Sequence, residues 1–205
     1  MMPDSTREGQ TQHDGRRILA RLTRPFQAGE IMNEADKLAR AGRTTIEGRE
    51  ILSKNWGTLS RYSVDYMRKD GAHQHLKREV YDRGDGAAIL LYNTDQNTVI
   101  LTRQMRFPVF LRDNEGDLIE VCAGMLDGEA PAEAIRREAE EETGINLDHV
   151  EEIAALYTSP GAVTERLHLF VGAYTGAMRT GPGGGLLHEA RKSPCWNYPF
   201  PKPWP

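Results

Sequence analysis

Three glutamates near the end of a predicted helix could hold a divalent cation. From Pro131 onward the sequence is rich in helix-forming residues, and Gly144 stands where a helix would stop. Glu138 and Glu141 are three residues apart, and Glu138 and Glu142 are four apart, so their carboxylates share one helix face and repel one another. A cation would relieve that repulsion. Carboxylate oxygens suit magnesium, which keeps several waters and usually bridges to substrate phosphates.

The same residues also fit a plainer interpretation, a solvated helix face that carries glutamates and arginines. Glu140 points away from the other three, so we interpret it as solvated or structural. Arg136 and Arg137 could compensate part of the negative charge. The spacing of the glutamates alone does not decide between a solvated face and a metal site.

A longer pattern around this helix resembles the signature of the Nudix hydrolases. The matching positions are Glu129, then after seven residues Arg137-Glu138, Ala139, Glu141-Glu142 and Gly144-Ile145. One position departs from the family pattern. The family's leading glycine lies six residues before the first glutamate, where this chain has Ala123, and Gly124 lies only five before Glu129. The shorter loop, in the form CAGMLDGE, is similar to the GDP-mannose pyrophosphatase subgroup.

The resemblance to that subgroup runs from about Ile46 to Glu189, through segments such as KREVYDRG, RQMRFP and LYTSPGAVTE. It implies a magnesium enzyme, with manganese as a possible substitute, that splits the pyrophosphate of GDP-mannose into GMP and mannose 1-phosphate. It also implies a homodimer in which N-terminal strands cross to the partner and help to build its site. ADP-ribose or another ADP-sugar is the nearest alternative substrate, because base choice rests on a few loop contacts.

The resemblance also assigns residues by position. The implied metal ligands are Glu138, Glu142, the carbonyl of Ala123 and Glu189, with Glu141 assisting through water and Arg137 steadying the carboxylates. Glu165 is the implied base that accepts a proton from the attacking water. The implied substrate contacts are Trp56, Lys77, Arg78, Glu79, Arg106, Ala123, Gly124 and Met125.

Several of these residues have a second interpretation that the sequence leaves open. Glu165 could be a solvated loop carboxylate, and Lys77-Arg78-Glu79 could be the polar face of an exposed strand. Trp56 could stack on guanine or pack in the core. Arg106 suits a diphosphate because the guanidinium group binds such anions through two parallel hydrogen bonds.

The elements that must position these residues are mostly strands. Alternating patterns at 61–67 and 75–81 predict a hairpin, and 86–92 with 98–105 predict a second, more buried pair. Further strands are expected at 117–124, 152–157 and 167–174. Strands around a single acidic helix indicate the α/β class, as a mixed α+β sandwich. Together with the resemblance, this predicts a Nudix fold with an N-terminal antiparallel hairpin used in dimerisation.

Length and composition limit the other possibilities. The chain has 205 residues and a formal net charge of -4, without a basic block, so a nucleic-acid polymer is not an expected partner. It contains no apolar run long enough to span a membrane, and its first residues do not form a signal peptide. Two cysteines do not indicate a disulfide framework, so we expect a cytoplasmic location.

The chain divides into three parts. We expect residues 1–44 to be a poorly ordered extension, residues 45–189 to be the Nudix hydrolase domain, and residues 190–205 to be an aberrant proline-rich tail. Five of the last twelve residues are prolines, which cannot continue a helix. The family instead continues with a strand and a helix that carries a substrate-contacting lysine.

The codons of the tail are compatible with a second reading frame that encodes a different sequence. When the third base of each codon is joined to the first two of the next, Cys195–Trp196 gives Leu, Trp196–Asn197 gives Glu and Asn197–Tyr198 gives Leu. The frame permits V-L-E-L-P-F-S-E-A-L-A, which resembles the family's strand-to-helix segment. We therefore hypothesise a frameshift close to Glu189, which could leave a catalytically impaired product. Sequencing the locus tests this, and codons incompatible with V-L-E-L-P would refute it.

Overall fold

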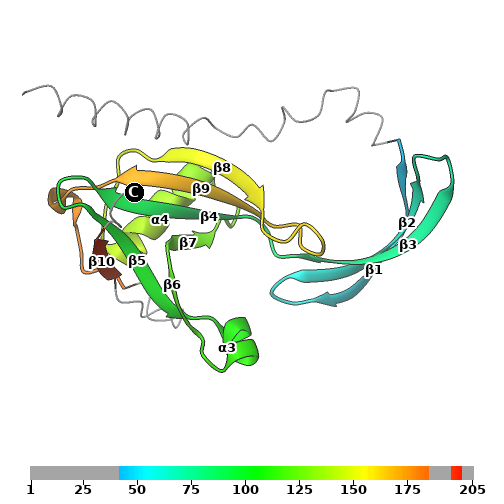
Figure 1. Ribbon diagram of the computed structural model, residues 1–205, viewed down its shortest axis with the longest axis horizontal. Coiled ribbons are helices and arrows are strands. Elements are labelled where there is room, and N and C mark those ends of the chain that lie inside the picture. Colours follow the sequence, from blue (N-terminus) through cyan, green and yellow to red (C-terminus); the bar gives the residue numbers. More distant parts are fainter. Residues whose placement is uncertain (1–41, 185–194, 200–205) are drawn as a thin grey trace, which may run out of the picture.

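The computed structural model describes residues 42–184 and 195–199, which form two sheets and a few helices (Figure 1). The strands are β1 (Thr44–Lys54), β2 (Thr58–Met67), β3 (His73–Asp82), β4 (Gly86–Asn93), β5 (Thr98–Met105), β6 (Asp117–Glu120), β7 (Cys122–Met125), β8 (Glu151–Tyr157), β9 (Arg166–Ala173) and β10 (Cys195–Pro199). The helices are α3 (Phe107–Asp113), α4 (Pro131–Thr143) and the short 3-10 helix η1 (Gly176–Met178).

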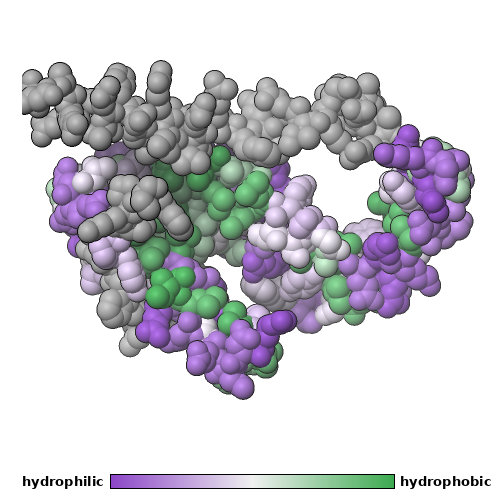
Figure 2. Space-filling model, in the orientation of Figure 1, coloured by the Kyte–Doolittle hydropathy of each residue, from purple (hydrophilic) through white to green (hydrophobic). Residues whose placement is uncertain are grey.

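Strands β1, β2 and β3 form an antiparallel sheet that projects from the rest of the molecule (Figure 1). A bulge between Ile46 and Gly48 shifts the register of β1 against β2. Because a bulge changes which side chains face which side, Ile46 and Ile51 both lie on the same face despite their odd spacing. Hydrophobic and hydrophilic residues are mixed on the surface of this projecting sheet (Figure 2).

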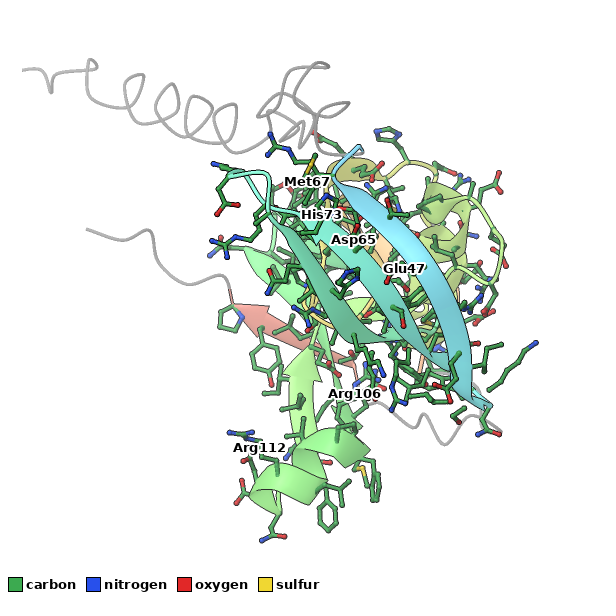
Figure 3. All side chains as sticks on the ribbon, turned by 90° about the vertical axis from the view of Figure 1, so that its right-hand side faces the viewer. Glu47, Asp65, Met67, His73, Arg106 and Arg112 are labelled. Atoms are coloured by element: carbon green, nitrogen blue, oxygen red, sulfur yellow. The ribbon has the colours of Figure 1, made fainter. Side chains whose placement is uncertain are left out.

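The opposite face of the three-stranded sheet is polar. The Nδ1 atom of His73 lies 2.7 Å from a carboxylate oxygen of Asp65, and Nδ1 of His75 lies 3.3 Å from Glu47. Figure 3 looks onto this sheet and shows Glu47, Asp65 and His73 on its strands. The two faces therefore differ in chemistry, one carrying isoleucines and the other carrying ion pairs.

The second sheet has the strand order β10-β5-β4-β9-β8, and β4 lies at its centre. Residues 86–92 of β4 pair with β9 in parallel, while the other edge of β4 is shared between β7 and β5. Residues 86–89 of β4 pair with β7, and residues 91–93 pair with β5. This division of one edge leaves β7 beside α4, at the end of the sheet where β4 begins.

Helix α4 covers one face of the second sheet and forms the core with it. The buried residues of this core include Ile89, Leu91, Ile100, Ile135 and Phe170. The helix begins at Pro131, whose fixed φ suits a first helical position. It ends at Gly144, which has φ 70° and donates its N–H to the carbonyl of Glu140. Both helix ends agree with the sequence prediction.

Most of the predicted strands are confirmed, and the structure extends the N-terminal hairpin to residues 58–67 and 73–82. The segment 117–124 was expected to be one strand, and this is wrong. It divides at Val121, because Glu120 pairs with Thr102 of β5 whereas Cys122 pairs with Ile89 of β4. Helix α3 was not predicted, and within the described residues it buries none of its own side chains.

The tail also contains an element that was not expected. Residues 195–199 form β10 and pair with β5, with Pro199 opposite Thr98 at the end of the strand. A proline is tolerated there because it sits at an edge strand, where its missing N–H costs no ladder bond. The rest of the predicted tail and nearly all of the predicted extension 1–44 lie outside the described residues. Across the described parts of the chain, no helix is long and apolar enough to span a bilayer.

Candidate active site

The carboxylates predicted to hold a metal lie on the buried side of α4. Glu142 is 1% exposed and Glu138 is 7% exposed, although both side chains are acidic. Arg137 donates from Nη1 to Glu138 at 3.2 Å and to Glu141 at 3.3 Å. Its Nε also bonds Glu129, at 3.4 Å. The three glutamates therefore share a face, as the spacing predicted, and Arg137 bridges two of them.

This ion-pair network changes the acid–base balance of Arg137. Burial alone would lower the pKa of its guanidinium group, but the attraction of Glu138, Glu129 and Glu141 outweighs that cost and raises the pKa above its ordinary value. A raised pKa favours the protonated form, so any stability gained from Arg137 is fully present below its unfolded-state pKa. Arg137 stays charged throughout the physiological range.

Glu140 lies on the other side of the helix, as expected. It accepts hydrogen bonds from Nδ2 of Asn146 at 3.3 Å and from the hydroxyl of Thr180 at 3.1 Å. Its side chain is exposed. The contact with Thr180 ties the helix to the segment after η1, and together the two contacts give Glu140 a structural role.

Strand β7 passes so close to α4 that only a glycine fits at one position. A Cβ atom added to Gly124 would overlap the carboxyl group of Glu138 and would lie 2.6 Å from its Cγ. Ala123, Gly124 and Met125 follow one another in this strand, all of them half-buried. Gly124 is therefore placed directly against the Glu138 carboxyl group, and the other two predicted residues, Ala123 and Met125, flank it in β7.

Glu165 approaches the same strip of backbone from the opposite face of the sheet. A Cβ on Gly86 would lie 3.2 Å from the carbonyl oxygen of Gly124 and 3.8 Å from Oε1 of Glu165. Glu165 itself is 6% exposed and accepts a hydrogen bond from the hydroxyl of Thr158 at 2.9 Å. The alternative interpretation of Glu165 as a solvated loop carboxylate is therefore wrong.

Arg83 was not singled out from the sequence, yet it joins two predicted residues. Its guanidinium group forms an ion pair with Glu165, which lies 82 residues later in the chain. The same group lies over the ring of Trp56, with its Cζ atom 5.3 Å from the ring centroid. The Trp56 ring is 73% exposed, so the alternative interpretation of core packing is wrong. No local signal marks Arg83, because its partner is distant in sequence.

A tight turn fixes the position of Trp56. The N–H of Asn55 bonds the carbonyl of Gly57 at 3.0 Å, which closes the turn between β1 and β2. A Cβ on Gly57 would lie 2.6 Å from ring atoms of Tyr81. Gly57 is therefore required for the turn to rest against β3, and the turn carries Trp56 to Arg83.

A pocket of about 310 Å³ is lined by members of both groups of residues. It is lined by residues 83–85 and 125–129. Arg83, on one wall, leads to Glu165 and Trp56, while Glu129, on another, leads through Arg137 to Glu138. Its volume lies at the lower end of the range for small-molecule sites.

Within one chain, the predicted substrate contacts Lys77, Arg78 and Glu79 do not lie beside the α4 carboxylates. Glu79 faces Arg61 and pairs with it at 2.9 Å, on the polar face of the three-stranded sheet. Lys77, two residues earlier, points to the same face, whereas Arg78 lies opposite Tyr62 on the other face. All three are exposed on the projecting sheet, away from α4 (Figure 1).

Arg106 lies at the base of α3, where Figure 3 shows it together with Arg112. Its Nε donates to Glu120 at 2.7 Å, so the guanidinium group is already oriented by a carboxylate. Glu189, the fourth predicted ligand, lies outside the described residues. Within residues 42–184 and 195–199, no three acidic, histidine or cysteine side chains form a group that could hold a metal by themselves.

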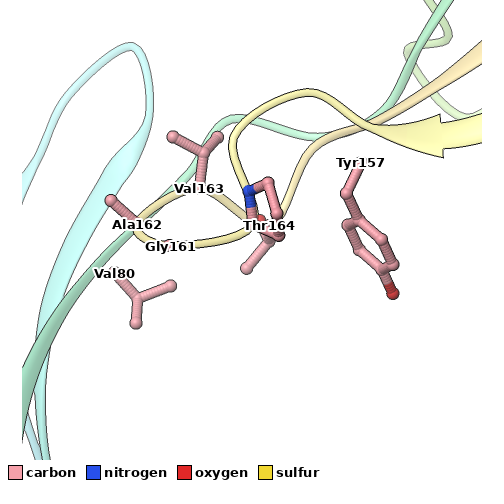
Figure 4. Close-up of a pocket in the computed structure, with 7 residues that line it drawn as sticks. Val80, Tyr157, Gly161, Ala162, Val163 and Thr164 are labelled. Atoms are coloured by element: carbon pink, nitrogen blue, oxygen red, sulfur yellow. The ribbon is translucent and has the colours of Figure 1, made fainter.

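A second pocket, of about 390 Å³, borders the loop before β9 (Figure 4). It is lined by Val80, Tyr157 and residues 160–164. The loop is anchored to β3, since the N–H of Tyr81 bonds the carbonyl of Ala162 and the N–H of Thr164 bonds the carbonyl of Tyr81. These bonds fix the loop that leads into Glu165.

Comparison with known proteins identifies this arrangement. The family model of the NUDIX domain matches residues 82–196, which include α4 and the strands β4 and β7 beside it. The chain belongs to the Nudix family. It is a Nudix hydrolase, and a second model, the GDP-mannose pyrophosphatase NudK N-terminal domain, matches residues 43–81, which form the three-stranded sheet.

Curated Nudix relatives extend the similarity. A GDP-mannose pyrophosphatase of Pectobacterium atrosepticum is 51% identical over 145 residues, which cover 70% of this chain and 75% of the relative. One from Cronobacter sakazakii is 49% identical, with 68% and 74% covered. One from Escherichia coli is 48% identical, with 71% and 76% covered.

A solved structure of an ADP compounds hydrolase has a similar fold. The TM-score is 0.56, and the match covers 77% of this chain and 79% of that one. The identity is 20%, so this likeness bears on the fold alone. It confirms the expected α/β Nudix architecture.

Proposed function

We propose that this Nudix hydrolase cleaves the pyrophosphate of GDP-mannose in the presence of magnesium, releasing GMP and mannose 1-phosphate. The observation that carries the proposal is the pocket between residues 83–85 and 125–129, whose walls lead to the α4 carboxylates on one side and to Glu165 on the other. The names of the relatives at about half identity supply the substrate.

The residues around Gly124 fit a divalent cation. Because Gly124 has no side chain, the backbone of β7 lies directly against the Glu138 carboxyl group, and Glu142 stands one helical turn further along α4. Carboxylate and carbonyl oxygens are the donors that magnesium prefers, and it is usually held by one or two carboxylates together with substrate phosphates. Glu138, Glu142 and the Ala123 carbonyl would hold magnesium or manganese, with Glu189 as the further ligand implied by the family. When bound, the ion neutralises diphosphate charge and polarises phosphorus.

The remaining chemistry belongs to side chains of this chain. Glu165 is a carboxylate held in place by Thr158 and Arg83, as a proton acceptor for an attacking water should be. Arg137 keeps Glu138 and Glu141 oriented. The exposed ring of Trp56 offers a flat apolar surface on which a guanine can stack.

We also propose that two copies associate through the three-stranded sheet. One face of that sheet carries Ile46 and Ile51, which are 64% and 54% exposed. Exposed apolar residues gathered on one sheet face favour a protein interface. Lys77, Arg78 and Glu79 lie on this projecting sheet, so a partner's site is where they could reach a substrate. The low cysteine content supports a cytoplasmic location.

A panel of nucleotide sugars tests the proposed substrate. Purified protein with magnesium is offered GDP-mannose, ADP-ribose and an ADP-sugar, and a phosphatase converts the products to free phosphate. We expect GDP-mannose to give the highest kcat/KM. A preference for ADP-ribose would reassign the base. Turnover with none of them, combined with activity in a chain whose tail is restored to the hidden reading frame, would show an impaired product.

A further inference from the structure

The guanidinium group of Arg83 makes two contacts, one with the Trp56 ring and one with the Glu165 carboxylate. The Cζ atom of this guanidinium group lies over the Trp56 ring, 5.3 Å from the ring centroid, while Nη2 donates to Oε1 of Glu165. A guanidinium group can do both at once, because it stacks through its face and donates hydrogen bonds from its edge. An ammonium group donates hydrogen bonds to a carboxylate but, as a compact point charge, has no planar face with which to stack on a ring.

The surroundings of Arg83 leave room for this double contact to serve a ligand. Trp56 is mostly exposed, so it contributes little to the core, and it stands at a turn held by Gly57. Glu165 is almost fully buried, and its second oxygen is held by Thr158. Arg83 itself is partly exposed and lines the pocket that adjoins Met125 and Glu129.

We propose that Arg83 is a positioning residue that couples nucleobase recognition at Trp56 to proton acceptance at Glu165. The guanidinium group sets the orientation of the Trp56 ring and, through its edge, the orientation of the Glu165 carboxylate. A base stacked on Trp56 is therefore held in a fixed position relative to the Glu165 carboxylate, which accepts the proton from the attacking water. This inference rests on the proposed function, and it adds a residue and a coupling to it.

Two measurements separate the two contacts. Binding of GMP, followed by isothermal titration calorimetry, reports on the Trp56 surface, and kcat on GDP-mannose reports on Glu165. Arg83→Gln removes both contacts, so we expect GMP to bind about two- to fivefold more weakly and kcat to fall about 10²-fold. Trp56→Leu weakens GMP binding about tenfold. Adding Arg83→Gln to Trp56→Leu should weaken GMP binding no further.

Arg83→Lys divides the two roles. A lysine keeps the charge that holds Glu165 but lacks the flat face for Trp56. We expect kcat to recover to within about threefold of the original chain, while GMP binding stays as weak as in Arg83→Gln. A purely structural role would move both values together.

Arg166 supplies a matched control. Its Cζ lies 5.8 Å from the ring centroid of Tyr157, which is an exposed arginine–aromatic pair one residue beyond Glu165. We expect Arg166→Gln to change neither GMP binding nor kcat. Equal losses in Arg166→Gln and Arg83→Gln would overturn the inference, because any surface arginine would then serve.

The remaining outcomes also decide the matter. The inference is overturned if Arg83→Gln leaves both values unchanged, or if the effects of Arg83→Gln and Trp56→Leu on GMP binding multiply. If Arg83→Gln does not fold, Arg83→Lys carries the test, and a loss of kcat there overturns the coupling. Inactivity of the original chain on GDP-mannose would instead overturn the proposed function.

Discussion

Gly124 lies against Glu138 so closely that no side chain fits between them. A Cβ on Gly124 would stand 2.6 Å from Cγ of Glu138 and would overlap its carboxyl group. The shortened loop that begins with this glycine therefore has a physical reason. It lets the backbone of β7 rest directly on the buried face of α4, where Glu138 and Glu142 lie.

Substituting Gly124 should damage activity more than folding. In Gly124→Ala the added methyl group meets Cγ and the carboxyl group of Glu138, so this side chain must move aside. A displacement of about 1 Å in a catalytic group typically costs about 10²-fold in rate, so we expect a loss of that size in kcat/KM. Gly176→Ala is the control, because its Cβ would meet nothing within 4 Å. Equal activity in both variants would show that Glu138 does not need its present position.

Glu142→Gln should abolish the response to magnesium. The change keeps the shape of a buried side chain and removes a charge that repels its neighbours. We expect kcat to fall at least about 10²-fold, since metal-based charge stabilisation is worth several kcal/mol. Magnesium should raise the melting temperature of the original chain but not that of the variant. Glu140→Gln, on the exposed side of the same helix, should behave like the original chain, and full activity in Glu142→Gln would refute the ligand assignment.

Replacing Gly144 with alanine should lower the free energy of unfolding more than replacing Gly128, although both glycines have positive φ. A Cβ on Gly144 (φ 70°) would lie 2.7 Å from the carbonyl carbon of Gly181, whereas a Cβ on Gly128 (φ 91°) would meet nothing within 4 Å. Gly128→Ala should cost about 1–2 kcal/mol of unfolding free energy from the backbone conformation alone. We expect Gly144→Ala to cost more, because backbone must also move. Urea unfolding measures both, and an equal cost would show that the contact relaxes freely.

Disrupting the apolar face of the three-stranded sheet should separate the copies. Ile46→Asp together with Ile51→Asp places charges on that face, and burying them unpaired in an interface is costly. We expect sedimentation velocity to show a dimer for the original chain and a monomer for the double variant. Thr45→Lys, on the polar face, is the control. A dimer that survives the isoleucine changes would place the interface elsewhere.

The sequence predicted the helix and most strands because their signals are local. Pro131 and Gly144 mark the two ends of α4, and the alternation at 61–67 and 75–81 marks a hairpin. The change of partner at Val121 was missed because a strand pattern does not say which neighbour it pairs with. The bulge at 46–48 was missed for a similar reason, since it depends on register against β2.

The candidate site could be predicted only in part. The shared face of the α4 glutamates followed from their spacing, whereas their role as metal ligands and the role of Glu165 came from the resemblance. Arg83 carries no sequence signal, because its role depends on Trp56 and Glu165, which the fold brings to it from 27 residues before and 82 residues after. The burial of Glu165 likewise depends on the docking of its loop against β3, which no local pattern encodes.

Product analysis by phosphorus NMR tests the central claim most directly. The chain is incubated with GDP-mannose and magnesium, with a parallel sample that contains excess chelator. The account predicts that GMP and mannose 1-phosphate appear together in equal amounts, and only when magnesium is present. Release of GDP and free mannose, or the same products at the same rate in chelator, would contradict it.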